Sequence, residues 1–173
     1  ALAPVHGRTP LPTQVDVVTM FHEFAHGMHH LLTRVAYPSL AGINGVAWDG
    51  VGLPSQFFEN YAWHPEVLQR MSAHVDTGKP LPADKQAQLI ATRSFHAGLS
   101  MMRQLEYALF DFRLHAGYDP KTAGRIANVL AQVRGEVAVV PMPDWNRFAH
   151  SFGHVFAGGY AAGSEAHRIT SNL

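Results

Sequence analysis

The stretch Phe21-His22-Glu23-Phe24-Ala25-His26 decides how the rest of this sequence is interpreted. It is an H-E-x-x-H motif, and apolar residues recur around it at spacings of three and four, as on a helix buried along one side. These residues are Val17, Val18, Phe21, Phe24, Ala25, Met28 and Leu32. Thr13 can cap the start of the helix, because Asp16 follows three residues later as in a variant of the capping box. The pattern predicts a helix over about residues 13–34.

The spacing of the two histidines suits one zinc ion. A helix advances about 100° and 1.5 Å per residue, so His22 and His26 lie one turn apart on the same face and can bind a single Zn²⁺. Glu23 directly follows the first histidine, and its carboxylate can act as a general base. The alternative is that two histidines, in a chain that has 12 of them, are polar residues on a solvated helix face.

The composition limits the classes of protein to which the chain can belong. A length of 173 residues with 47% hydrophobic and 15% charged residues is typical of one soluble globular domain. The formal net charge is zero, so electrostatics give no argument for a nucleic-acid or membrane partner. Cysteine is absent, which excludes disulfides and thiolate zinc sites. No signal peptide or apolar run of spanning length is present, and we expect a cytoplasmic location.

The rest of the chain shows further helical patterns separated by loops, which together predict a mainly α fold. Glycine-rich residues 36–52 predict a loop. Pro65 can open a helix, and Asp119-Pro120 resembles an N-cap followed by proline at the first helical position. Helices are therefore expected over about residues 54–63, 65–75, 83–116 and 120–134, followed by an extended segment at 137–140 and a loop-rich region at 144–163.

The motif and several later segments resemble the thimet oligopeptidase and oligopeptidase A family of zinc metallopeptidases, the M3 family. The matching segments are residues 22–32, 45–60, 103–106, 109–115 and 154–163. Members of this family are several times longer than this chain. The resemblance therefore implies a helical zincin-type catalytic core, truncated relative to the family, with residues 1–173 as a single partial metallopeptidase catalytic domain.

The resemblance also implies roles for individual residues. His154 and Tyr160 match family positions that contact the substrate and the developing oxyanion, and both side chains can donate hydrogen bonds to it. Asp49 resembles an aspartate that orients a zinc histidine without binding the metal itself. The implied activity is zinc-dependent hydrolysis of oligopeptides by a metal-activated water, with Glu23 as the base.

One ligand position departs from the family pattern. The third zinc ligand of the family is a glutamate in a V-E-L-P-S-Q type segment, and Gly52 stands at this position. Glycine also weakens the local helix by about 1 kcal/mol relative to alanine. Glu59 is seven residues further on, about 10 Å along a helix axis, so we expect it to support the site or the fold rather than bind the metal. We expect water at the third position and weak zinc binding.

The last ten residues, 164–173, form an atypical tail that does not match the family. Ser164, Glu165 and His167 stand where the family has tyrosines that help to stabilise the transition state. A truncated reading frame, a frameshift and an appended sequence would each account for this loss of similarity.

Three hypotheses follow. The first is a zinc metalloendopeptidase acting on oligopeptides; the second is a degenerate or truncated homologue with weak metal binding and little or no catalysis. The third is a helical structural or interaction domain in which the histidines are incidental. Metal content separates the third hypothesis from the others, and peptide turnover that depends on Glu23 separates the first from the second. A truncated domain exposes core faces, so we also expect self-association.

Overall fold

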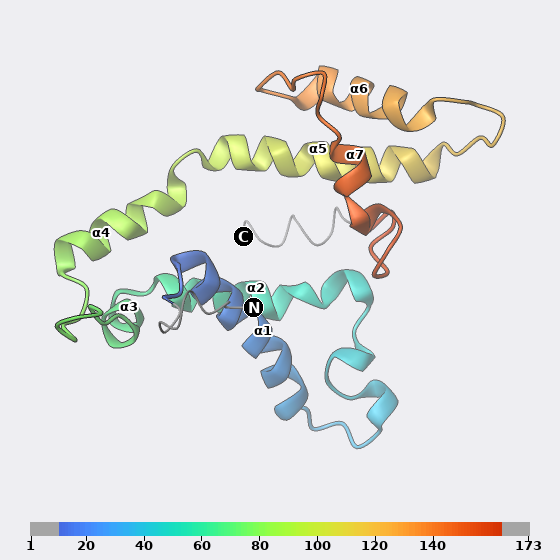
Figure 1. Cartoon of the computed structure of the whole chain (residues 1–173). Coiled ribbons are helices and arrows are strands. Elements are labelled where there is room, and N and C mark those ends of the chain that lie inside the picture. The colour runs from blue at the N-terminus through green and yellow to red at the C-terminus, as the bar shows by residue number, and fades with distance from the viewer. Residues whose placement is uncertain (1–10, 164–173) are drawn as a thin grey trace. The chain divides into compact units, whose positions relative to one another are not determined.

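Residues 11–163 are described by a computed structural model, and within them the chain forms helices and loops without a β-strand (Figure 1). The α-helices are α1 (Gln14–Leu31), α2 (Gly52–Glu59), α3 (Pro65–Met71), α4 (Ala83–Ala91), α5 (Ala97–Ala116), α6 (Arg125–Val137) and α7 (Phe148–Ser151). Short 3-10 helices are η1 (Pro38–Leu40), η2 (Gly42–Gly45), η3 (Trp48–Gly50), η4 (Asn60–Trp63), η5 (Thr92–Ser94) and η6 (Gly153–Val155). The prediction of a mainly α fold is confirmed, and the atypical tail at 164–173 lies outside the described residues.

The chain divides into two compact units between Arg93 and Ser94. The first unit contains α1 to α4 and the second contains α5 to α7. The single partial domain over residues 1–173 stays a prediction. None of the helices in the described part of the chain is long and apolar enough to span a membrane.

The first helix begins where its capping signal predicts. The Thr13 hydroxyl accepts the backbone N–H of Asp16 at 3.3 Å, and the Asp16 carboxylate accepts the backbone N–H of Thr13 at 2.8 Å. This reciprocal pair is the expected capping box. The Thr13 hydroxyl also donates to the Asp16 carboxylate at 2.7 Å, and this hydrogen bond, followed by the one from the Thr13 backbone N–H, lowers the pKa of Asp16. The helix ends at Leu31, three residues before the predicted end.

Small residues allow α1 and α2 to pack closely in the first unit. The buried residues are Ala25 in α1 and Gly52 and Ser55 in α2, and the two helices are in extensive contact. The Ser55 hydroxyl donates to the Gly52 carbonyl at 2.9 Å, which satisfies a hydroxyl that is 0% exposed. The packed faces bring the histidine motif of α1 against a carboxylate of α2.

The prediction of one long helix over residues 83–116 is wrong. It is divided into α4, η5 and α5, because His96 adopts a left-handed backbone conformation with φ of 55° immediately before α5. A left-handed residue cannot continue a right-handed helix. The apolar spacing continues on both sides of His96, so periodicity alone does not reveal the break.

The predicted start of the following helix is also wrong. α6 begins at Arg125 rather than at residue 120, and Gly124 precedes it with φ of 68°. Asp119 forms a local turn instead of capping a helix, since its carboxylate accepts the Lys121 backbone N–H at 3.0 Å and the Thr122 hydroxyl at 2.8 Å. Aspartate favours both arrangements, and here the turn forms. Val137, predicted to be extended, is the last residue of α6.

The second unit has its own apolar core between α5, α6 and α7. Its buried members are Phe110, Leu114, Val129, Leu130, Val133, Phe148 and Val155. Buried Glu106 accepts hydrogen bonds from Arg103 at 2.6 Å and Arg134 at 2.8 Å. A buried carboxylate with two cationic partners is compensated where an unpaired one would be costly, so this cluster joins α5 to α6 without leaving an uncompensated charge.

Candidate metal centre

The two motif histidines meet at their Nε2 atoms. His22 and His26 lie one turn apart on α1, their Nε2 atoms are 3.2 Å apart, and their ring centroids are 4.9 Å apart in an edge-to-face arrangement. Two nitrogens that bind one zinc ion at about 2.05 Å with a tetrahedral angle are separated by about 3.3 Å. The pair therefore fits two ligand positions of a zinc ion.

A carboxylate from α2 lies behind the first histidine. Glu59 Oε1 is 2.7 Å from His22 Nδ1, and the two side chains are 27% and 26% exposed. A carboxylate accepts hydrogen bonds, so Nδ1 carries the hydrogen and the lone pair of His22 Nε2 faces His26. This is the tautomer that a metal-binding imidazole needs.

Electrostatics make the two imidazoles unequal. The hydrogen bond to Glu59 raises the pKa of His22. Burial lowers the pKa of His26, and the neighbouring His22 lowers it further. In the metal-free chain the first proton therefore binds to His22, and His26 stays neutral to lower pH.

In this chain, the residue at the third ligand position of the family is a glycine, which has no side chain to bind a metal. Gly52 is the buried first residue of α2, two helical turns before Glu59. Within residues 11–163, no group of three or more His, Cys, Asp or Glu side chains is placed to hold a metal ion. Asp49 is exposed in η3, and its role as the partner of a zinc histidine stays a prediction. The described residues thus fit zinc with two nitrogen donors and lack a third protein donor.

The other predicted catalytic residues lie in two places. Glu23 is exposed on α1, in the first unit. His154 and Tyr160 belong to the second unit, where their ring centroids are 4.6 Å apart. Gly158 and Gly159 precede Tyr160 with φ of 75° and 77°, a conformation that glycine adopts without steric cost. The structure thus brings together two groups, the histidine pair with Glu59 and the pair of His154 with Tyr160.

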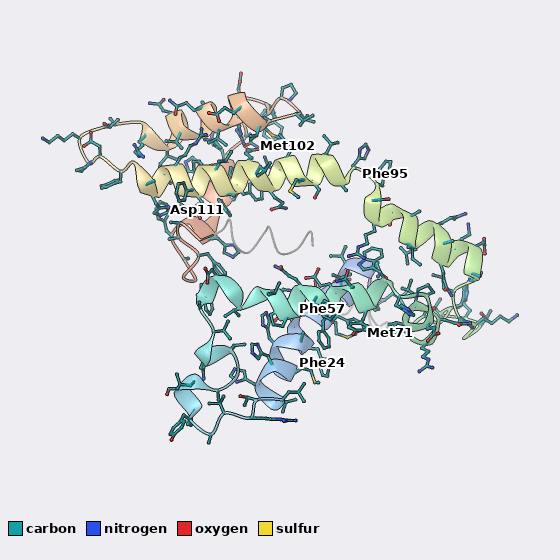
Figure 2. The ribbon with its side chains drawn as sticks, turned by 180° about the vertical axis from the view of Figure 1, so that it is seen from behind. Phe24, Phe57, Met71, Phe95, Met102 and Asp111 are labelled. Carbon is teal, nitrogen blue, oxygen red and sulfur yellow. The ribbon has the colours of Figure 1, made fainter. Side chains whose placement is uncertain are left out.

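The sequence predicts that Glu59 supports the site or the fold, since it lies seven residues, or two helical turns, after Gly52 and on nearly the same face of one helix. The structure identifies its partner, because the Glu59 carboxylate contacts His22, 37 residues away in the chain. The orienting role implied for Asp49 stays a prediction. What the sequence lacks is the packing of α1 against α2 (Figure 2), which brings Glu59 to His22.

A helix that carries H-E-x-x-H, with a carboxylate behind its first histidine, is the arrangement of zinc-dependent peptidases. The chain belongs to peptidase family M3, whose family model matches residues 2–163. It is 51% identical to oligopeptidase A of Salmonella typhimurium over 160 residues, which are 92% of this chain and 24% of the relative. The same values hold for oligopeptidase A of Escherichia coli.

More distant similarity extends to a differently named peptidase. Dipeptidyl carboxypeptidase of Salmonella typhimurium is 37% identical over an alignment of 175 residues, which covers 98% of this chain and 25% of the relative. The chain thus spans about a quarter of the length of these curated relatives.

Proposed function

We propose that this chain is a catalytic segment of a zinc-dependent metalloendopeptidase, an oligopeptidase that hydrolyses bonds in short peptides. The observation that carries the proposal is the 3.2 Å separation of the His22 and His26 Nε2 atoms, with Glu59 on the other nitrogen of His22. Membership of the M3 family and the names of the relatives, oligopeptidase A among them, support the same activity.

The proposed mechanism assigns each residue one task. His22 and His26 would hold the zinc ion, which when bound polarises a carbonyl and lowers the pKa of water. The exposed carboxylate of Glu23 accepts a proton from the attacking water and passes it to the leaving amine. His154 and Tyr160 donate hydrogen bonds to the oxygen that becomes negatively charged in the tetrahedral intermediate.

A second candidate function is a degenerate or truncated homologue with weak metal binding and little or no catalysis. The specific observation in its favour is Gly52, since the third donor of the family is missing and the described residues offer no replacement. Two neutral imidazoles also leave the charge of a dication uncompensated. Both candidates predict binding of zinc, and they differ in turnover.

The experiment measures zinc content and cleavage of an internally quenched oligopeptide on the same preparations. Glu23→Gln should abolish turnover and retain zinc, because this carboxylate is assigned as base and not as ligand. Glu66→Gln, at an exposed position of α3, is the matched control and should equal the parent. Zinc binding without turnover in the parent supports the degenerate homologue. Absence of zinc binding refutes both candidates and leaves the helical structural or interaction domain.

Location and assembly remain parts of the proposal. We propose a cytoplasmic enzyme, and the names of two Arabidopsis thaliana relatives include "cytosolic" in one case and "organellar" in the other. Large apolar side chains such as Phe24 and Phe57 are each 59% exposed in the first unit (Figure 2). Their exposure supports the proposed self-association, which sedimentation velocity over a range of concentrations would detect.

A further inference from the structure

A buried carboxylate ties the loop that carries Tyr160 to α5. Asp111 is 1% exposed on this helix, close to α7 and the loop that follows it (Figure 2). Its Oδ1 atom accepts the backbone N–H of Ala162 at 3.0 Å, across 51 residues of sequence. A hydrogen bond in the protein interior is electrostatically stronger than one in water, so this contact can hold the loop in place.

The backbone of the loop requires such a restraint. Ala162 has a φ of 55°, in the left-handed region that costs a residue with a side chain about 1–2 kcal/mol. Gly158 and Gly159 also have positive φ, but glycine adopts these values freely and therefore adds no stiffness. The hydrogen bond from Ala162 to Asp111 stabilises the strained end of a segment whose other end is conformationally permissive.

His115 holds the same carboxylate from within α5. Its Nδ1 atom is 2.8 Å from the Asp111 carbonyl oxygen and 3.0 Å from Asp111 Oδ1. Both oxygens are acceptors, so Nδ1 carries the hydrogen. The His115 ring also lies edge-on to Phe156, with centroids 5.7 Å apart, on the segment that leads into the loop. Asp111 is thus fixed on its own helix while it binds the loop.

We propose that Asp111 is a positioning residue for Tyr160. Its bond to Ala162 holds residues 158–163 so that the Tyr160 ring stays 4.6 Å from the His154 ring, centroid to centroid. The proposal rests on the proposed function, because it assigns a support to the two side chains that would stabilise the intermediate. Asp111 itself touches neither substrate nor metal in this scheme.

The test measures the conformation of the loop directly and does not require peptide turnover. Amide hydrogen exchange of Ala162 is measured by ¹⁵N NMR, and the Tyr160 side chain is followed by ¹⁹F NMR after 3-fluorotyrosine labelling, with Tyr160→Phe for assignment. Asp111→Ala and the volume-filling Asp111→Leu should each lower Ala162 protection at least about tenfold and shift the Tyr160 signal. Asp111→Asn keeps an oxygen acceptor and should restore most of both.

The control is Glu136→Ala. It removes the ion pair of α6 with Arg113 of α5 and leaves the Asp111–Ala162 contact in place, so both readouts should match the parent. Parental protection and an unmoved Tyr160 signal in Asp111→Ala overturn the proposal. If neither apolar variant folds, the test is made on the parent protein. Exchange of its Ala162 amide at the rate of a free peptide also overturns the proposal.

Measurement of peptide turnover then distinguishes a failure of the positioning role from a failure of the proposed hydrolysis. If the parent cleaves peptides, Asp111→Ala should lower kcat with unchanged zinc content, and Asp111→Asn should recover it; an unchanged kcat overturns the positioning role. If the parent cleaves none, the proposed hydrolysis fails, while the exchange and fluorine results still decide whether Asp111 holds the loop.

Discussion

Replacement of Glu59 by glutamine should weaken zinc binding and leave the fold intact. The carboxylate accepts the His22 Nδ1 hydrogen at 2.7 Å, and a glutamine oxygen can accept the same hydrogen, so the variant removes charge while keeping the geometry. A hydrogen bond to a charged group contributes about 1.5–3 kcal/mol, against about 0.5–1.5 kcal/mol for a neutral one. The difference is on the order of 1 kcal/mol.

Solvent exposure places the effect at the lower end of its range. Loss of a carboxylate behind a metal-binding histidine typically costs about 10–100-fold in affinity. Here both side chains remain about a quarter exposed, so water screens part of the interaction. We therefore expect zinc affinity to fall about tenfold, which corresponds to about 1.4 kcal/mol.

The assay is competition with a chromophoric chelator at pH 8, where protons compete little with zinc. Parent, Glu59→Gln, Glu59→Ala and the exposed control Glu66→Gln are titrated side by side, and ¹⁵N NMR of the metal-free protein reports the His22 tautomer. The alanine variant should bind at least as weakly as the glutamine variant. Equal affinity of parent and Glu59→Gln, with the fold retained, would refute the assignment of Glu59 as the residue that prepares His22 for the metal.

Three further outcomes are expected. Gly52→Glu restores the ligand type of the family and should raise zinc affinity at least about tenfold; the same chelator titration would show no gain if position 52 does not face the metal. In the metal-free chain, His22 should titrate at higher pH than His26 in ¹⁵N NMR, because its pKa is raised and that of His26 is lowered. The stability that His22 contributes should therefore be fully present below the ordinary histidine pKa of about 6.5 and be lost as pH rises through its raised pKa. The stability contributed by His26, whose pKa is lowered, should instead be lost as pH falls. Urea unfolding of the parent and of a His26→Gln variant at pH 5.5 and 8 separates the two contributions. Gly158→Ala should destabilise the chain by about 1 kcal/mol and displace Tyr160, since φ is +75° and the added Cβ would lie 3.0 Å from the Tyr160 ring; an unchanged melting temperature and Tyr160 fluorine signal would contradict this.

The features that could be predicted from sequence are those set by local geometry. The capping box at Thr13 and Asp16 was predicted and is present, because both partners lie within four residues of each other. The facing of His22 and His26 follows from the i, i+4 spacing in any α-helix. The absence of a carboxylate at position 52 is equally a property of the sequence, and so is the family resemblance that gives it meaning.

Two helix boundaries that the sequence did not reveal lie where local preferences compete. Helical periodicity continues through His96, yet its left-handed conformation divides α4 from α5. Asp119 satisfies the rules for both an N-cap and a turn, and the start of α6 at Arg125 shows which one forms. Local propensities leave such choices nearly balanced, so the sequence pattern alone does not select between them.

The sequence by itself determined the chemical content of this protein: two imidazoles and a carboxylate on one helix, and a glycine where the family has a third ligand. Only the tertiary structure decided which distant groups support them, pairing Glu59 with His22 and Asp111 with Ala162. The physical reason is range. A helix places neighbours three and four residues apart by covalent geometry, whereas contacts across 37 or 51 residues depend on how whole elements pack against one another.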